Sequence, residues 1–240
     1  MIDLHCHILP CVDDGATSWE MADQMCQMAF DDGITHIVAT PHANSKYPYR
    51  REIFSELLAK LQRRTKTKLR FSLGCDFHLS YENIESLFSD AGQFLIEGTP
   101  YLLIEFNDYA LPPNFERLLF RMNTELDIRP ILTHPERNPI LQRHPESILP
   151  WVNAGCLIQV TAGALIGKWG QRACEVAMWL LQNNAIHVVA TDAHDPFKRP
   201  PILSAAREFL VKTCGGATAL NLLDTNPLAI VHGQAVGSSS

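Results

Sequence analysis

Seven short apolar runs separated by helical patterns constrain the fold of this chain more than any other feature. The runs are rich in β-branched residues and cover Met1–Leu4, Ile34–Ala39, Leu69–Leu73, Tyr101–Ile104, Ile128–Leu132, Leu157–Val160 and Ile186–Ala190. Nearly continuous apolar strands that alternate with helices predict an α/β fold with a helix-covered parallel sheet. Seven units favour a closed or nearly closed barrel. An open doubly wound sheet is the alternative, but no glycine-rich nucleotide loop follows any run.

Amphipathic helices are predicted between these strands. Thr17-Ser18-Trp19-Glu20 has the form of a capping box, which predicts the start of a helix, and Gly33 is a plausible C-cap. Met21, Met25 and Met28 follow the box on one helical face, where we expect them to be core rather than interface. Further helical patterns cover Ile53–Leu61, Phe115–Met122, Ala173–Gln182 and Ile202–Lys212.

The bulk properties are those of a globular protein. The chain has 240 residues, of which 46% are hydrophobic and 19% are charged, and it shows neither a repeat nor a linker. We therefore expect a single domain over residues 1–236, followed by a disordered low-complexity tail, 237–240. All apolar runs are far shorter than a membrane span, and the first residues lack the pattern of a signal peptide. This predicts a cytoplasmic protein without membrane insertion.

Charge and cysteine usage narrow the classes of site. A formal net charge of −6 argues against a nucleic-acid partner, because nucleic-acid binders usually carry a basic face. The seven cysteines are odd in number and none forms C-x-x-C, which argues against a disulfide framework and a thiolate zinc site. Cysteine-dependent phosphatases need C-x5-R, acyl-serine hydrolases need G-x-S-x-G, and neither motif occurs.

Ionisable residues gather where the predicted strands end. Six of the seven runs terminate in a histidine or a carboxylate: His5 and His7, His42, Asp76, Glu105, His134, and Asp192 with His194. In a barrel these ends converge on one face, where catalytic groups lie. Imidazoles with carboxylates suit Zn, Mn or Fe, and the absence of thiolates leaves Mn and Fe open. Asp13 and Asp14 follow in the first loop, where one of them could add an oxygen ligand.

These motifs resemble those of a known family. The chain is similar to the polymerase and histidinol phosphatase (PHP) superfamily and, more closely, to the bacterial manganese-dependent protein tyrosine phosphatases of capsule and exopolysaccharide operons. The resemblance runs from Met1 to about Val231. The matching segments are Met1–Ile8, Val12–Gly15, Thr40–His42, Leu103–Phe106, His134–Arg137, Gln159–Thr161, Ala190–His194 and Arg199–Pro201. The V-D-D-G and H-x-E-R elements separate this branch from other PHP proteins.

The resemblance implies a distorted seven-stranded TIM-like barrel and three divalent metals, with manganese expected and iron or zinc as alternatives. One metal would take His5, His7 and Asp192, with Asp76 bridging. A second would take Asp76, Glu105 and His134, and a third would take Asp14, His42 and His194. Arg137 would bind the phosphate with help from Arg199. His194 or a metal-bound water could supply a proton to the leaving group.

The implied activity is hydrolysis of phosphotyrosine on a bacterial tyrosine kinase that regulates polysaccharide export. The alternatives are a small-molecule phosphatase, such as one for histidinol phosphate, another PHP phosphoesterase such as a nuclease, and a metal-binding regulator without turnover. Asp76 keeps the last alternative open, because the family usually has Glu at the bridging position. The basic and aromatic segment Ala43–Arg51 is either a substrate-steering element or a solvated loop, and Asn107–Pro113 is a candidate rim loop.

Overall fold

The computed structural model describes residues 1–237 and has a mixed α/β fold with parallel sheets. The described residues form nine strands in two sheets, with orders β1-β2-β4 and β3-β5-β6-β7-β8-β9. The strands are β1 (Ile2–Cys6), β2 (His36–Ala39), β3 (His42–Ala43), β4 (Arg70–Leu73), β5 (Asp76–His78), β6 (Tyr101–Glu105), β7 (Arg129–Thr133), β8 (Leu157–Thr161) and β9 (Val188–Ala190). All seven predicted strands are present, and β3 and β5 are additional.

The two additional strands are continuations of predicted ones after a short break. β3 follows β2 after two residues, and β5 follows β4 after two residues. Pro41 in the first break has no N–H to donate to the ladder, but its carbonyl still accepts from the Asp76 amide at 3.1 Å. His42 and Asp76 therefore begin strands that pair with each other, whereas the sequence pattern predicts them at strand ends. The nine strands thus correspond to seven strand units.

The pairing stops short of a closed sheet in the described residues. β1 and the segment after β9 are joined by one isolated parallel bridge, Cys6 to Ala193. Around it, the His7 amide donates to Ala193 O and the Asp192 amide donates to His5 O, both at 2.8 Å. These bonds bring the first and last strand units side by side. They bring together the two segments of the chain that carry H-x-H and D-x-H.

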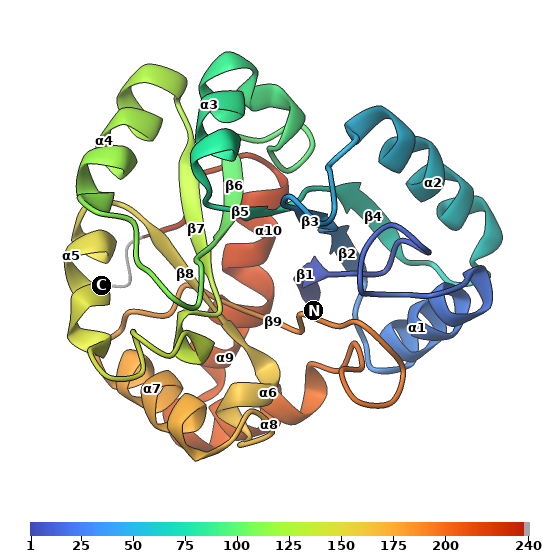
Figure 1. Cartoon of the computed structure of the whole chain (residues 1–240). Coiled ribbons are helices and arrows are strands. Elements are labelled where there is room, and N and C mark those ends of the chain that lie inside the picture. Colours follow the sequence, from blue (N-terminus) through green and yellow to red (C-terminus); the bar gives the residue numbers. More distant parts are fainter. Residues whose placement is uncertain (238–240) are drawn as a thin grey trace.

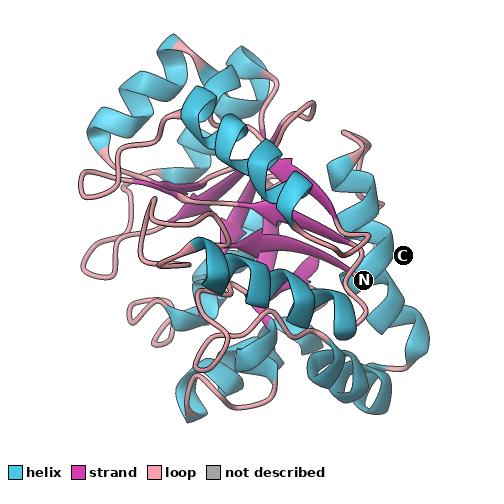
Figure 2. Ribbon diagram, turned by 90° about the vertical axis from the view of Figure 1, so that its right-hand side faces the viewer, coloured by secondary structure: helices cyan, strands magenta, loops and turns pink. Residues whose placement is uncertain are grey.

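Helices surround the strands, as Figures 1 and 2 show. They are α1 (Trp19–Asp31), α2 (Arg51–Arg64), α3 (Tyr81–Ser89), α4 (Phe115–Leu126), α5 (Ile148–Asn153), α6 (Ala162–Leu165), α7 (Gln171–Gln182), α8 (Ser204–Cys214), α9 (Gly216–Leu220) and α10 (Asn226–Val231). The predicted helices correspond to α1, α2, α4, α7 and α8. Met25 is buried in the core, and Met21 and Met28 are partly buried.

The start of α1 differs from the prediction by one residue. A capping box from Thr17 to Glu20 would make Thr17 the N-cap, but the N-cap is Ser18. The Ser18 hydroxyl accepts from the Met21 amide at 3.1 Å, and its extended backbone leads into the first turn. Thr17 instead contacts the Met21 sulfur. Thr17 and Ser18 are both residue types that can cap a helix, so the geometry of the preceding loop decides which of them is the N-cap.

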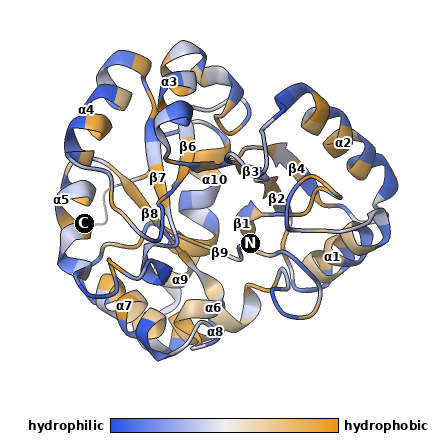
Figure 3. Cartoon of the chain, viewed as in Figure 1, coloured by the Kyte–Doolittle hydropathy of each residue, from blue (hydrophilic) through white to orange (hydrophobic). Residues whose placement is uncertain are grey.

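Side chains on opposite faces of the strands belong to two different apolar clusters, and ionisable residues follow at one end of the strands. Tyr101, Leu103 and Ile131 belong to a small inner cluster, whereas Leu102 and Ile104 pack in the larger cluster beneath the helices. Ile230 of α10 joins the inner cluster, and α10 crosses behind the strands in Figure 1. Because side chains alternate with period two, Glu105 continues the inner face of β6. In Figure 3, hydrophobic residues colour much of the strands, and the surrounding helices carry both hydrophobic and hydrophilic residues.

The structure bears on the predicted C-terminal tail and on the prediction about membrane insertion. The predicted tail, 237–240, lies outside the described residues except for Gly237. Within the described part of the chain, every helix is too short or too polar to cross a membrane.

Candidate active site

The carboxyl ends of the strands bring nine predicted metal ligands together. They form four overlapping groups whose ligand atoms lie within 4.8 Å of one another: His7, Asp14, His42 and His194; His5, Asp76 and His134; His5, His7 and Asp192; and His42, Asp76 and Glu105. The residues predicted to hold the first metal, His5, His7 and Asp192, form one of these groups. Those predicted to hold the third metal, Asp14, His42 and His194, form another group together with His7. Asp76, Glu105 and His134 are divided between two groups that share Asp76.

His5 and His7 present their Nε2 atoms to each other. The Nδ1 atom of His5 lies 2.9 Å from Gln159 Oε1, and that of His7 lies 2.7 Å from Asp13 Oδ2. These acceptors favour a proton on each Nδ1 and leave the Nε2 lone pairs free. The two Nε2 atoms are 3.1 Å apart, with Asp192 Oδ1 at 3.4 and 3.3 Å. Two lone pairs and a carboxylate converging in this way fit a shared cation.

Asp76 is the most informative member of the cluster. Its carboxylate is fully buried, and its Oδ2 atom has no hydrogen-bond partner. The same oxygen lies 3.3 Å from His42 Nδ1, 3.6 Å from His5 Nε2 and 4.0 Å from His134 Nε2. A buried carboxylate oxygen without a donor is costly unless a cation balances it. The position and chemistry of Asp76 therefore fit a metal ligand.

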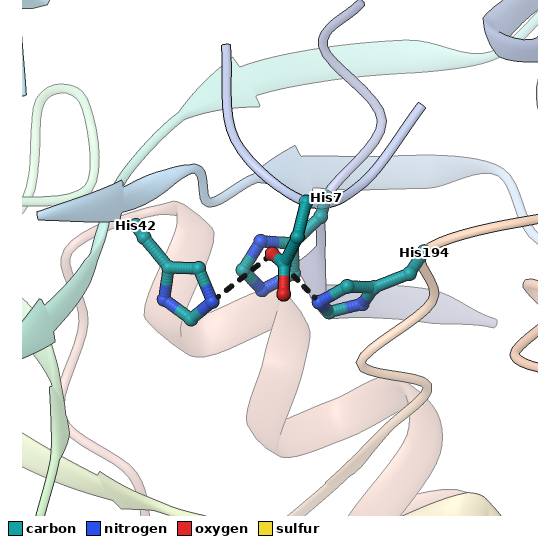
Figure 4. A group of neighbouring side chains, drawn as sticks. His7, His42 and His194 are labelled. Atoms are coloured by element: carbon teal, nitrogen blue, oxygen red, sulfur yellow. Dashed lines mark ion pairs between the residues drawn. The ribbon is translucent and has the colours of Figure 1, made fainter. Parts of the chain in front are cut away.

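Asp14 and two imidazoles form the outer edge of the cluster. Asp14 Oδ1 lies 3.3 Å from His42 Nε2 and 3.4 Å from His194 Nε2, and Figure 4 shows these rings beside His7. The Nδ1 atom of His194 is 3.0 Å from Asp192 O. Asp14 is 47% exposed, whereas Asp76 is fully enclosed, so this edge faces solvent. A substrate can approach the cluster from here.

Two arginines meet the cluster at one carboxylate oxygen. Arg137 donates through Nη1 and Arg199 through Nη2 to Asp192 Oδ2. Arg137 also stacks on Trp169, with 3.9 Å from Cζ to the ring centroid, and Arg199 lies 5.2 Å from the same ring. Both guanidinium groups are about three-quarters buried. Arginine's planar fork grips phosphate oxygens in pairs, so these residues suit a phosphate that bridges cluster and arginines.

Burial and neighbouring charges set the protonation of the cluster. Although burial opposes ionisation, His5, Arg137 and other cations hold the pKa of Asp192 well below its usual range. Burial, helped by the nearby carboxylate of Asp76, raises the pKa of Glu105. Burial and Arg137 lower the pKa of His134, and burial and His7 lower that of His194 to about 4. Although burial opposes protonation, the surrounding carboxylates raise the pKa of His5, that of His7 to about 9 and that of His42 to about 11, so a divalent metal would have to displace protons from these rings.

Comparison with known proteins shows the family of this chain. The family model for capsular polysaccharide synthesis proteins CpsB/CapC matches residues 1–232. This chain belongs to the CpsB/CapC family. It is 33% identical to the tyrosine-protein phosphatase YwqE of Bacillus subtilis over 199 residues, which cover 81% of this chain and 78% of YwqE. It is 31% identical to the putative tyrosine-protein phosphatase CapC of Staphylococcus aureus over 207 residues, 85% of this chain and 80% of CapC.

The fold is shared with the same family. A crystal structure from work on YwqE of Bacillus subtilis and CpsB of Streptococcus pneumoniae, described as unique metal-dependent tyrosine phosphatases, matches this chain with a TM-score of 0.88. The sequence identity is 31%, and the match covers 99% of this chain and 96% of that one. The family resemblance inferred from the motifs is therefore confirmed.

Several residues support the CpsB/CapC site without belonging to the predicted set. Asp13, which the motif left as an alternative to Asp14, holds His7 and also accepts from the His42 amide at 3.1 Å. Gln159 holds His5, and its only sequence signal was its place in the Q-V-T segment. Trp169 stacks on both arginines, which no local pattern indicated. Glu136 turns inward to Thr161 and forms no ion pair with Arg137 in the described residues.

The segment Ala43–Arg51 divides into a rim part and a structural part. Tyr47 stacks on His42 at 6.0 Å between ring centroids, and Lys46 lies over Tyr47. In contrast, the Tyr49 hydroxyl donates to Gly74 O at 2.9 Å, and Arg51 donates to Gln93 O and Leu95 O. Lys46 and Tyr47 are therefore the members of this segment that remain candidates for contact with a substrate.

Proposed function

We propose that this protein is a metal-dependent tyrosine phosphatase that hydrolyses phosphotyrosine on a bacterial tyrosine kinase regulating capsule or exopolysaccharide synthesis. The observation that carries the proposal is the convergence of nine side chains that could hold metal ions beside two arginines. Such a set can neutralise a phosphate dianion and hold it in place. The names of the family members and the activity described for YwqE and CpsB support the same reaction.

The proposed cofactor is three divalent metals, with manganese as the ion. His5, His7 and Asp192 would hold one, Asp76, Glu105 and His134 a second, and Asp14, His42 and His194 the third. Asp76 would bridge the first two, since its orphaned Oδ2 lies between His5 and His134. We interpret the seven strand units around this site as a distorted TIM-like barrel within one domain, 1–236.

The metals would supply charge neutralisation and a bound water of lowered pKa. The side chains of the protein then have separate tasks. Arg137 and Arg199 would grip the equatorial phosphate oxygens and balance the charge that grows there in the transition state. Trp169 stacks against both guanidinium groups and keeps them facing the cluster. Asp13 and Gln159 keep the His7 and His5 rings in one orientation.

A phenolate leaving group makes cleavage of the phosphate ester easier. Tyrosine has a pKa of about 10, so its oxygen leaves with little help from a proton. His194 lies at the exposed edge of the cluster beside Asp14, and because burial and His7 lower its pKa to about 4, it would pass a proton there through a bound water rather than donate one of its own. All seven cysteines are free, which is compatible with the proposed cytoplasmic location, where thiols stay reduced.

Metal analysis combined with phosphatase assays tests the proposal. Wild-type protein should bind manganese and hydrolyse an aryl phosphate, whereas His7→Ala should lose bound metal and at least about 100-fold in kcat/KM. His144→Ala is the matched control, because His144 is 65% exposed and pairs only with Glu146 among the described residues. Full activity and unchanged metal content in His7→Ala would reject the site.

A substrate panel separates this proposal from a small-molecule phosphatase. We expect phosphotyrosyl peptides to be hydrolysed with higher kcat/KM than histidinol phosphate or phosphoseryl peptides. The opposite order would assign the protein to small-molecule metabolism. Metal binding without hydrolysis of any phosphate would assign it to regulation.

A further inference from the structure

The cavity between α6 and the segment that leads into α8 is unassigned. It has a volume of about 280 Å³. Its lining residues are Ala162, Gly163, Ile166, Lys168, Trp169, Thr191, Lys198, Arg199, Pro200 and Ile202. Figure 1 shows α6 next to the start of α8, and the two helices contact each other. We propose that this cavity is the subsite for the phosphotyrosine ring and that Lys168 and Lys198 at its mouth select acidic residues beside the phosphotyrosine. This inference rests on the proposed function.

The cavity adjoins the metal cluster through Arg199 and Thr191. Arg199 lines the cavity and donates to Asp192, one of the metal-ligand candidates. Thr191 also lines the cavity and directly precedes Asp192 in the chain. A phosphate held by Arg199 therefore has its ester oxygen within reach of the cavity. The tyrosine ring is attached to that oxygen and would therefore lie next to this cavity.

The walls have the chemistry that an aromatic ring requires. Ile166, Trp169, Pro200 and Ile202 form an apolar lining, and small ligand sites combine such a lining with a few placed polar groups. A second cavity, of about 250 Å³, lies on the other side of Trp169. Its lining is more polar than that of the first cavity and combines the carboxylates of Glu105 and Asp108 with His134 and Arg137. The apolar ring and acidic flanks of a substrate favour the first cavity.

Trp169 is held in place as the shared wall of both cavities. Arg137 stacks on its ring at 3.9 Å. The backbone of α6 approaches its edge so closely that a Cβ atom at Gly163 would lie 3.0 Å from Trp169 Nε1 and 3.1 Å from Cδ1. The wall is therefore formed before the substrate arrives, which limits the entropy cost of binding.

The mouth of the cavity is cationic although the whole chain is acidic. Lys168 and Lys198 are exposed, and neither forms an ion pair within the described residues. The nearby Asp195 carboxylate accepts from the backbone amides of Phe197 and Lys198, both at 2.7 Å, and so shapes the loop that carries Lys198. Unpaired cations at a rim attract acidic groups and accelerate their association, an effect that weakens with salt.

Two small substrates test the apolar part of the subsite. Phenyl phosphate carries the ring, whereas acetyl phosphate has a good leaving group without a ring. The double variant Ile166→Ala/Ile202→Ala should lower kcat/KM for phenyl phosphate about tenfold and leave acetyl phosphate within about twofold. Ile53→Ala on α2 is the control, since Ile53 is 45% exposed and does not line this cavity. Equal losses for both substrates, or no loss for either, would overturn the subsite.

Two phosphotyrosyl peptides test the cations, one with acidic and one with alanine neighbours. Lys168→Glu/Lys198→Glu should raise KM for the acidic peptide about fivefold more than KM for the alanine peptide at low salt, because only the acidic peptide also loses the attraction of its flanking carboxylates. Lys66→Glu/Lys68→Glu makes the same charge change just before β4, at the opposite ends of the strands. If both peptides respond alike, or if the control pair has the same effect, the selectivity is rejected. Wild-type protein that hydrolyses no phosphate with manganese would instead reject the proposed function.

Discussion

Individual side chains in this site are oriented by carboxylates and amides that do not face the substrate. Asp13 accepts from two groups that define the cluster, the His7 ring and the His42 amide. Gln159 does the same for His5. Asp192 itself has a left-handed backbone, with a φ of 51°, and such strain is maintained only where surrounding bonds compensate for it. Here its amide donates to His5 O, and its side chain binds both arginines.

Removing the Asp13 carboxylate should loosen the His7 ring without removing a proposed ligand. We expect Asp13→Ala to lower manganese affinity and kcat/KM by about 10- to 100-fold, the usual cost of losing a hydrogen bond behind a metal-binding imidazole. Asp13→Asn should retain more activity, because the amide can still accept from His7 Nδ1. Isothermal titration with manganese and steady-state assays measure both quantities. Wild-type affinity in Asp13→Ala would show that the loop orients His7 unaided.

Gly15 makes room for the backbone of His7. A Cβ atom at Gly15 would lie 2.1 Å from His7 O and 2.5 Å from His7 Cβ, distances that require the loop to move. Gly15→Ala should therefore lower the free energy of unfolding by about 2 kcal/mol and also reduce activity. Gly216→Ala, where a Cβ meets nothing within 4 Å, is the control and should be neutral or slightly stabilising. Denaturant unfolding distinguishes the two variants.

At the scale of elements, strand breaks and helix caps determine where the side chains of the site lie. The breaks between β2 and β3 and between β4 and β5 let His42 and Asp76 pair in register at the rim. The loop before α1 carries Asp13 and Asp14 and ends at the Ser18 cap. Because this loop lies between β1 and α1, a well-anchored helix start keeps one end of the loop with Asp13 and Asp14 in place.

The N-cap of α1 can be tested directly. Ser18→Ala should destabilise the protein by about 1 kcal/mol, since the Met21 amide loses its acceptor. Thr17→Ala should cost less, although the sequence pattern alone marked Thr17 as the cap. Thermal unfolding of the two variants gives the comparison. A larger loss for Thr17→Ala would place the helix start one residue earlier.

At the scale of the whole molecule, the two ends of the strands have opposite character. The carboxyl ends carry the ionisable cluster, and the opposite end is closed by apolar contacts with α10. His36 begins β2 at this opposite end, where its Nε2 lies 3.0 Å from Ser72 Oγ and its Nδ1 has no hydrogen-bond partner. Burial, with Arg70 nearby, lowers the pKa of His36 to about 4.

This shift predicts a loss of stability on acidification. Between about pH 6.5 and 4 the unfolded chain binds a proton at His36 that the folded chain does not, so the free energy of unfolding falls as pH falls through this window. The contribution is on the order of 2 kcal/mol, discounted for partial solvent contact. His36→Gln should flatten the pH dependence of urea unfolding in this range. An unchanged slope would mean that other groups dominate acid unfolding.

The sequence by itself determined the strand–helix alternation, the family and the set of ionisable residues at the strand ends. These features are local: apolar periodicity records which face is buried, and motifs such as H-x-H place two side chains on one side of a strand. The tertiary structure alone decided how these ionisable residues group. Asp76 became the shared member because a strand break turned it toward His5, His42 and His134. Contacts such as Gln159 with His5, and Trp169 with the arginines, join residues 30 or more positions apart, so no local pattern could specify them.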